Sequence, residues 1–335
     1  MERFNAACDA LAAVAFANRC VNKVELQKLA YHAIRRDFGL GAQMTVRAIA
    51  KVVEVYKRDK DIQPTFRPHG AIVYDQRIMS WKGADRVSLL TNDGRAFIPW
   101  VCGAYQQARL DRARGQADLI YRDGQFFLYV TIDIGDVPPG DPTEYLGVDL
   151  GLRNIAADSD GDTFCGAFNS NLRRRHARLR RKLQKKGTKS AKRLLRARRR
   201  KEAHFASDLN HKISKAIVRK AKDTGRGIAV EDLTGIRDRI TVRKPQRRAH
   251  SSWGFAQLRS FLTYKAEMYG VPLIAVNPRN TSRTCPCCGA IDKRNRPTRD
   301  SFQCISCGHA GPADTTAAVN ISRLGSRHAA ERRAV

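Results

Sequence analysis

Four cysteines near the carboxyl end of the chain have the spacing of a metal site. They form two Cys-x2-Cys pairs separated by 15 residues, and they are Cys285, Cys288, Cys304 and Cys307. Two such pairs can close a tetrahedral thiolate site around Zn²⁺, and four protein ligands leave no open position on the ion. The spacing therefore predicts a structural zinc ribbon. Cys287 is left over, either as an unligated neighbour or as a substitute for Cys288.

Three acidic residues far apart in the sequence could share a pair of divalent cations. Asp149 and Glu231 each end a short apolar run that is typical of a buried strand, and Asp314 opens a run with helical spacing. In ribonuclease H-like nucleases, carboxylates from separated segments converge at one edge of a sheet. Two Mg²⁺ ions about 4 Å apart can there activate water and stabilise the leaving oxygen of a phosphodiester. We therefore predict that Asp149, Glu231 and Asp314 are catalytic and bind Mg²⁺.

Neighbouring acids leave an alternative open. Asp232 follows Glu231 directly and could be the ligand in its place. Asp158, Asp160 and Asp162 also lie close to a predicted strand, and we interpret them as parts of a turn between two strands.

The whole chain carries an excess of positive charge. It has 62 Lys and Arg against 32 Asp and Glu, a formal net charge of +30 and a pI near 10.4. A nucleic-acid partner explains this charge most simply, although a solubilising charge or a ribosome-associated protein would also give such a net charge. No run approaches the ~18 apolar residues of a membrane-spanning helix, so we expect no membrane partner. Five of nine cysteines lie between 285 and 307, which indicates metal binding in a reducing cytosol.

The most basic segment, residues 173–201, has 17 Lys or Arg and no acid among 29 residues. Leu172, Leu179 and Leu183 recur at helical spacing, and Gly187 lies midway. We predict a helical hairpin that follows phosphates, although such a run is more often a solvated face or a disordered tail. A second basic set, within the ribbon, suits a phosphate contact or an exposed loop equally well; it comprises Lys293, Arg294, Arg296 and Arg299.

The predicted fold class is α/β plus α+β. Residues 1–60 repeat apolar positions at helical spacing and predict a helical module. Residues 61–142 contain short β-rich runs that predict an antiparallel barrel or sandwich, and they end in a Pro- and Gly-rich linker. Residues 143–335 alternate strands with helices, which predicts an α/β layer with the basic insertion at 169–222 and the zinc ribbon at 280–311.

Together these segments resemble the motifs of TnpB, a family of RNA-guided DNA nucleases encoded by bacterial insertion sequences and similar to compact type V CRISPR effectors. The resemblance covers nearly the whole chain. The matching motifs are Gly147–Gly151, Asp208–Ser214, Val230–Leu233, Asn277–Cys285 and Ala313–Ile321.

The resemblance implies a helical recognition module and a wedge β-barrel, followed by an RNase H-like RuvC domain that contains the zinc ribbon. Asp149, Glu231 and Asp314 fall on the catalytic positions of the family, and the four cysteines fall on its zinc positions. Guide RNA and target DNA would be the partners in the bacterial cytoplasm, with Zn²⁺ structural and Mg²⁺ catalytic. Base pairing would read the target, while the protein recognises a short flanking DNA motif.

Two features depart from the family pattern. Members usually begin with a β-strand segment, whereas this sequence begins inside the helical module, so either the wedge barrel lacks a strand or the start codon is misplaced. The usual Asn two residues after the third acid is Thr316 here, which changes the support of Asp314.

Other functions fit parts of the same pattern. A nuclease-inactive, guide-RNA-dependent DNA-binding repressor would keep the architecture, but only cleavage needs all three acids. An RNA-independent transposase or resolvase would use the same metal chemistry. A ribosomal or zinc-ribbon RNA-binding protein explains the charge and the cysteines but gives no reason for the acids.

Overall fold

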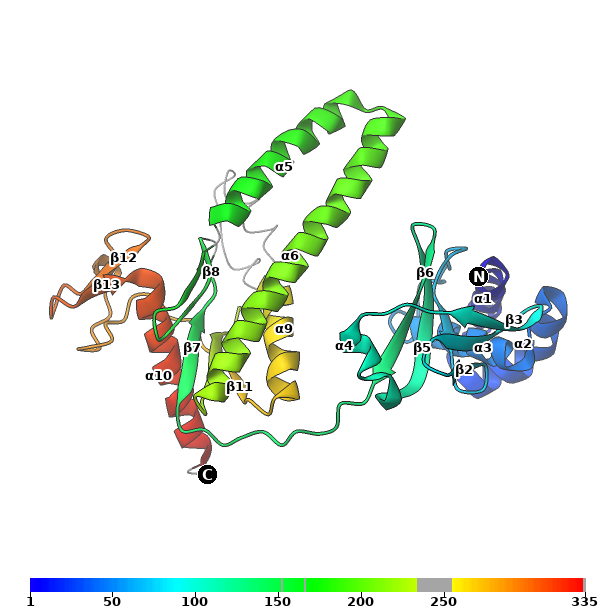
Figure 1. Cartoon of the computed structure of the whole chain (residues 1–335), viewed down its shortest axis with the longest axis horizontal. Helices are drawn as coiled ribbons and strands as arrows, with labels where there is room; N and C mark the ends of the chain where they lie inside the picture. Colours follow the sequence, from blue (N-terminus) through cyan, green and yellow to red (C-terminus); the bar gives the residue numbers. More distant parts are fainter. Residues whose placement is uncertain (152, 166, 234–254, 334–335) are drawn as a thin grey trace. The chain divides into compact units, whose positions relative to one another are not determined.

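The computed structural model describes residues 1–151, 153–165, 167–233 and 255–333, with the backbone alone for 167–174 (Figure 1). The chain divides into two compact units, Met1–Gly135 and Asp136–Val335. No helix in these described ranges is long and apolar enough to cross a membrane.

The first unit begins with three helices, as the apolar spacing predicts. They are α1 (Glu2–Ala17), α2 (Lys23–Phe38) and α3 (Ala42–Tyr56). The side chain of Asn22 caps α2 by accepting from the backbone N–H groups of Val24 and Glu25. Apolar residues of all three helices, among them Leu11, Leu26 and Ile49, meet in one buried core.

Six strands follow in the first unit, and they form two three-stranded antiparallel sheets. One sheet has the order β1-β5-β6 and the other has the order β2-β3-β4. The strands are β1 (Ile72–Tyr74), β2 (Met79–Lys82), β3 (Arg86–Thr91), β4 (Gly94–Pro99), β5 (Ala113–Arg122) and β6 (Gln125–Ile132), with the short helices α4 (Ala104–Gln107) and η1 (Leu110–Arg112) between β4 and β5.

The predicted β-barrel is not confirmed. No strand pairing joins the two sheets within the described residues, so the strands do not close on themselves. The chain leaves β1 after three residues in a turn where Ile78 N–H donates to Asp75 O. Both sheets instead pack on the core of the helices, through residues such as Tyr74 and Val87.

The second unit is built on a five-stranded mixed sheet with the order β11-β10-β7-β8-β9. Strands β7, β10 and β11 are parallel, while β8 and β9 pair antiparallel to their neighbours. The strands are β7 (Tyr145–Asp149), β8 (Asn154–Asp158), β9 (Thr163–Cys165), β10 (Gly227–Glu231) and β11 (Leu273–Val276). The sheet and its helices form an α/β layer, as the alternation of strands and helices in the sequence predicts.

Helices cover both faces of this sheet. On one face, Val148 and Val230 pack with α6 (Lys189–Asp223) and α9 (Phe255–Met268). On the other face, α10 (Ala313–Arg333) packs through Ile321 against Tyr145 and Ala229. The zinc ribbon lies between β11 and α10 in the sequence and contains η2 (Lys293–Asn295), β12 (Ser301–Gln303) and β13 (Ala310–Pro312).

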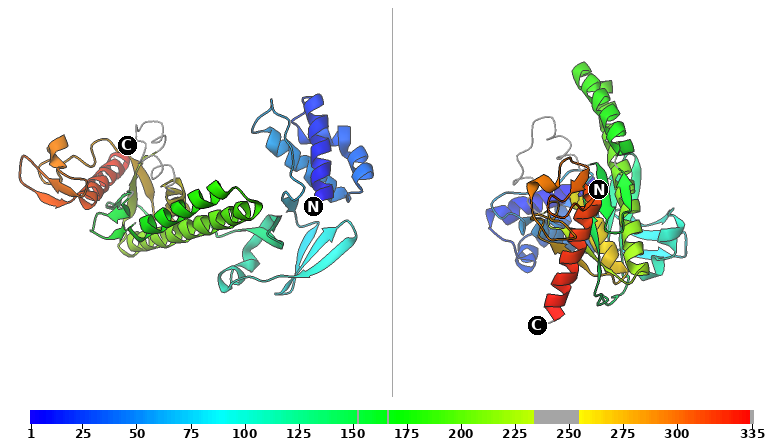
Figure 2. Two further views of the ribbon diagram at one scale, coloured as in Figure 1. Left: turned by 90° about the horizontal axis from the view of Figure 1, so that it is seen from above. Right: turned by 90° about the vertical axis from the view of Figure 1, so that its left-hand side faces the viewer.

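The basic segment forms a helical hairpin, which confirms the predicted structure of this segment. Helix α5 (Ala167–Lys186) and α6 run side by side as its two arms (Figure 2). Gly187 has a φ of +64° between them, and Thr188 caps α6 by accepting from Ala191 N–H. Leu183 is buried near the tip, whereas the side chain of Leu172 lies outside the described residues. Glu202 accepts from Arg180, which ties the arms together.

Gly147 sets how closely α10 approaches the sheet. A Cβ atom at this residue would lie 2.0 Å from Ala318 O and 2.4 Å from Ser322 N, both in the backbone of α10. Ser322 Oγ also donates to Tyr145 O over 2.6 Å. Because these contacts involve backbone atoms, the helix can keep this position only if residue 147 has no side chain.

Replacing Gly147 with Ala should therefore push α10 away from β7. We expect G147A to lower the free energy of unfolding by about 1–3 kcal/mol or more, because overpacking of a core contact costs this much. Thermal unfolding of the full chain, followed by circular dichroism, measures the change. The matched control is G140A, because a Cβ at Gly140 would lie at an ordinary 3.6 Å from its nearest neighbour. Equal stability of the two variants would contradict the argument.

Candidate functional site

Two of the predicted acids lie at the carboxyl ends of adjacent parallel strands. Asp149 is the last residue of β7, and Glu231 is the last residue of β10. Val148 pairs with Val230, so the acids occupy neighbouring positions at one edge of the sheet. Side chains alternate between faces along a strand, and Val148 and Val230 belong to the core on the α6–α9 face. Asp149 and Glu231 therefore point to the face that α10 covers.

The third acid reaches this edge from a helix. Asp314 lies in the first turn of α10, directly after β13 of the ribbon. A carboxylate at this position is stabilised by the N-terminal end of the helix dipole. The side-chain amide of Asn154, the first residue of β8, donates to Asp314 Oδ2 over 2.9 Å. Three separate elements thus bring their acids to one side of the sheet.

The electrostatics of Asp149 show that the three acids lie close enough to interact. The pKa of Asp149 is raised to about 7, first by burial and then by the charges of Glu231 and Asp314, which together outweigh the lowering effect of Arg296. Among the described residues, however, only the cysteine cluster brings its candidate ligand atoms within 4.8 Å of one another. The three acids converge, but their carboxylate oxygens lie farther apart than the ligand atoms around a single ion.

Glu231 and its neighbour Asp232 have different surroundings. Burial raises the pKa of Glu231, whereas the hydroxyl of Thr281, which donates to Glu231 Oε1, and the charge of Arg296 lower it. Asp232 instead forms an ion pair with Arg259 of α9 over 2.9 Å. The contacts therefore favour Glu231 as the residue that faces the other two acids.

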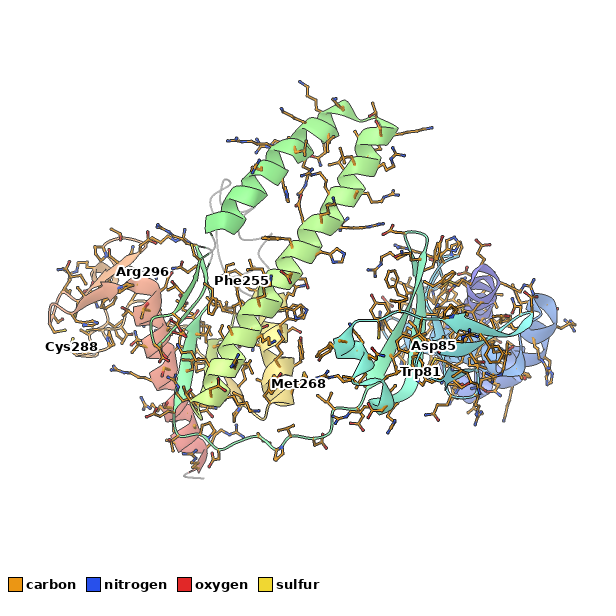
Figure 3. All side chains as sticks on the ribbon, in the orientation of Figure 1. Trp81, Asp85, Phe255, Met268, Cys288 and Arg296 are labelled. Atoms are coloured by element: carbon orange, nitrogen blue, oxygen red, sulfur yellow. The ribbon has the colours of Figure 1, made fainter. Side chains whose placement is uncertain are left out.

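A cation from the ribbon reaches the acids. Arg296 Nη2 lies 3.6 Å from Asp314 Oδ1, and the Arg296 side chain is 28% exposed. In the view of Figure 3, Arg296 lies beside the start of α10, and Cys288 lies farther from the sheet. Arg294 behaves differently, because it pairs with Asp292 of the same turn. Arg296 is thus placed beside the acids, whereas Arg294 is not.

The four predicted cysteines form one compact cluster. Cys285 Sγ lies 3.5 Å from Cys307 Sγ, and Cys288 Sγ lies 3.5 Å from Cys304 Sγ. These separations suit thiolates around one ion with Zn–S bonds of about 2.3 Å. Backbone N–H groups of the residues two positions after Cys285 and Cys304 donate to these two sulfurs, each over 3.4 Å. The residues present therefore fit a zinc ion.

Cys287 is exposed and lies outside the cluster. It contributes its backbone N–H to Cys285 Sγ, which is the role of an unligated neighbour.

The aspartates after β8 form a turn, as interpreted from the sequence. Asp158 is buried and accepts from the backbone N–H groups of Asp160 and Asp162. Lys220 of α6 contacts all three carboxylates, and Arg226 pairs with Asp160. This turn therefore fastens α6 to the sheet.

Two protein-family models match the chain. The probable-transposase model OrfB_IS605 matches residues 129–236, which include Asp149 and Glu231. The Cas12f1-like TNB domain model matches residues 255–321, which include the four cysteines and Asp314. The chain is a relative of the TnpB and Cas12f proteins. The resemblance that the motifs predict is thus confirmed.

Individual relatives agree with this family. A TnpB-like protein of Methanocaldococcus jannaschii is 28% identical over 198 residues, which cover 55% of this chain and 70% of that protein. The CRISPR-associated endodeoxyribonuclease Cas12f1 of Sulfoacidibacillus thermotolerans is 41% identical over 123 residues, or 36% of this chain and 28% of that protein. A Cas12f1 of Syntrophomonas palmitatica is 30% identical over 186 residues, and the chain spans 36% of its length.

A solved structure has the same fold as this TnpB relative. The Cas12f1 chain of a Cas12f1–sgRNA–target DNA complex superposes with a TM-score of 0.68 over 96% of this chain and 81% of that chain. The two sequences are 16% identical, so this likeness concerns the fold.

The partners of the acids include residues whose role the sequence pattern did not reveal. Asn154 and Thr281 each donate to an acid, yet they lie in a strand start and a loop, where no periodicity points to them. Thr281 belongs to the Asn277–Cys285 motif, which was the one available signal. Thr316 does not support Asp314, because its hydroxyl donates to Pro312 O over 2.9 Å.

Metal content should separate Cys287 from Cys288. We expect C287A to retain one zinc ion per chain, because its side chain lies outside the cluster, and C288A to lose it, because three thiolates bind the ion far more weakly. Atomic absorption on the purified chains measures the ratio. Loss of zinc from C287A, or full retention by C288A, would show that the ligand set is wrong.

The raised pKa of Asp149 predicts a pH dependence of stability. Between the ordinary value of 3.8 and about 7, folded Asp149 holds a proton that the unfolded residue has lost. The stability of the chain without added divalent cations therefore falls as the pH rises through this window. D149N removes the charge, so we expect it to melt at a higher temperature than the parent above about pH 7 and to lose this advantage near pH 4.

The control for this measurement is D232N, which removes the adjacent acid and its ion pair with Arg259. We expect no gain in melting temperature from D232N. If D149N melts below the parent across the whole pH range, Asp149 is not a destabilising buried charge.

Proposed function

We propose that the chain is an RNA-guided, Mg²⁺-dependent DNA endonuclease with a RuvC-type active site. One observation carries the proposal: Asp149, Glu231 and Asp314 point to one side of one sheet edge and interact electrostatically. In this proposal, residues 1–60 and 61–142 are the recognition and wedge modules, and residues 143–335 are the nuclease domain.

The three carboxylates suit hard divalent cations. Two Mg²⁺ ions held by Asp149, Glu231 and Asp314 would supply activation of the attacking water and stabilisation of the leaving oxygen. The protein contributes orientation, because Asn154 holds Asp314 and Thr281 holds Glu231. Arg296 is placed to contact a phosphate oxygen of the bound strand, since its guanidinium already lies at the acids.

The hairpin of α5 and α6 provides a surface for nucleic acid. Nearly all of its described Lys and Arg side chains project into solvent, and the exceptions include Arg180, which pairs with Glu202. Such rows of cations bind phosphates by releasing counterions. A guide–target duplex presents two phosphate backbones and suits a surface that recognises shape instead of sequence. The cysteine cluster would hold a structural zinc ion, because four thiolates leave it no open position.

Substitution of the acids tests the catalytic part of the proposal. We expect D149A and E231A each to lower the DNA cleavage rate more than about 100-fold, because loss of a direct ligand should exceed the effect of losing an outer-shell partner. The cleavage assay uses the chain with its copurified RNA and a DNA that matches this RNA. The matched control is D232A, which removes the neighbouring acid that pairs with Arg259. A D149A chain that cuts as fast as the parent, or a D232A chain as defective as E231A, would contradict the assignment.

The same preparation distinguishes the guided nuclease from an RNA-independent transposase or resolvase. Sequencing the copurified RNA should give one defined species, and RNase treatment should abolish cleavage. Cleavage that survives complete RNase treatment would favour the RNA-independent enzyme. The repressor alternative predicts guide-dependent DNA binding without cleavage by the parent chain.

A further inference from the structure

The loop between β11 and the first pair of cysteines is a fixed turn. Asn277 Oδ1 accepts from Arg279 N–H, and Asn280 O accepts from both Arg283 N–H and the hydroxyl of Thr284, each over 2.9 Å. Asn280 has a φ of +63°, a conformation that Asn tolerates better than most residues. These local bonds define the path of the loop from the sheet to the ribbon.

Asn320 of α10 fastens this loop from outside. The residue is 6% exposed, and its side-chain amide nitrogen donates to Thr281 O and to Thr284 O, each over 2.8 Å. Both N–H groups of the amide are therefore used, which fixes the side chain in one orientation. One turn further along α10, Arg323 donates to Pro286 O between the first two cysteines of the ribbon.

Thr281 connects the loop held by Asn320 to the site formed by Asp149, Glu231 and Asp314, which we call the acidic site. Thr281 is 3% exposed, and its hydroxyl lies within hydrogen-bonding distance of both Glu231 Oε1 and Pro278 O. A hydroxyl has one proton to donate, and a carboxylate is a stronger acceptor than a neutral carbonyl. The proton therefore goes to Glu231 and directs one of its oxygens.

We propose that Thr281 is a positioning residue for Glu231 and that Asn320 fixes Thr281, so that α10 orients two of the three acids. Asp314 belongs to α10 itself, and Glu231 is held to the same helix through Thr281 and Asn320. This inference rests on the proposed function, because it assigns Thr281 the task of orienting a cation ligand. Outer-shell partners of this kind typically contribute 10- to 100-fold to metal affinity or activity.

Three variants separate positioning from mere loop stability. T281V keeps the shape of the side chain and removes the hydroxyl, and T281S restores the hydroxyl. T284V is the matched control, because it removes a hydroxyl of the same loop that donates to Asn280 O and, among the described residues, contacts no acid. Zinc content and melting temperature of each full-length chain report whether the ribbon and the fold remain intact.

Two measurements then test the role of the hydroxyl. Mn²⁺ binding to the RNase-treated chain, followed by electron paramagnetic resonance, reports the cation site without requiring cleavage. The Mg²⁺ concentration for half-maximal cleavage by the RNA-bound chain reports the same site in the active complex. We expect T281V to weaken both by about 10- to 100-fold with an unchanged KM for DNA, while T281S and T284V stay close to the parent.

The result that overturns the positioning role is T281V behaving like T284V in both measurements. T281S failing to restore cation binding would also overturn it, because the hydroxyl would then not be the group that matters. If the parent chain does not cleave DNA, the proposed function fails, and the Mn²⁺ measurement alone decides whether Thr281 orients a cation ligand.

Discussion

The close contact between α10 and β7 is the constraint on which the candidate site depends. Gly147 lets the helix backbone lie against the strand, and Ser322 bonds to the strand at the same place. Because the acids of β7 and β10 point to the face that this helix covers, its first turn brings Asp314 to them. A bulkier residue at 147 would displace the helix and, with it, both Asp314 and the loop that Asn320 holds.

Gathering carboxylates at a partly buried edge is unfavourable, and the surrounding residues offset this cost unequally. Asn154 donates to Asp314, which also has Arg296 nearby and the N-terminal end of α10, and Thr281 donates to Glu231. Asp149 has less support: the influences that lower its pKa are Arg296 and a backbone N–H, and burial outweighs them. If the proposed cations bind here, Asp149 is thus the acid whose negative charge would depend on them most.

The sequence predicted features that are local or periodic. Examples are the cysteine spacing, the strand ends and the leucine spacing of the hairpin. Each of these patterns involves residues close in the chain, so it can be recognised without knowledge of the tertiary structure. The barrel was not confirmed because closure depends on which distant strands pair, and among the described residues no strand pairs with both sheets. Arg296 was left open between a phosphate contact and an exposed loop, because only the fold brings it to Asp314. Asn154 and Thr281 gave no periodic signal for the same reason.

The ribbon is part of the acidic site and not an appendage to it. Its entry loop carries Thr281 to Glu231, its basic turn carries Arg296 to Asp314, and its last strand leads directly into α10. An ion with four thiolate ligands has no position for a substrate, so zinc would perform no chemistry here. Zinc would instead order the ribbon, because metal binding supplies folding free energy to a small segment that has little hydrophobic core of its own. That energy would hold Arg296 and Thr281 in place, so the geometry of the three acids would depend on an ion that none of them contacts.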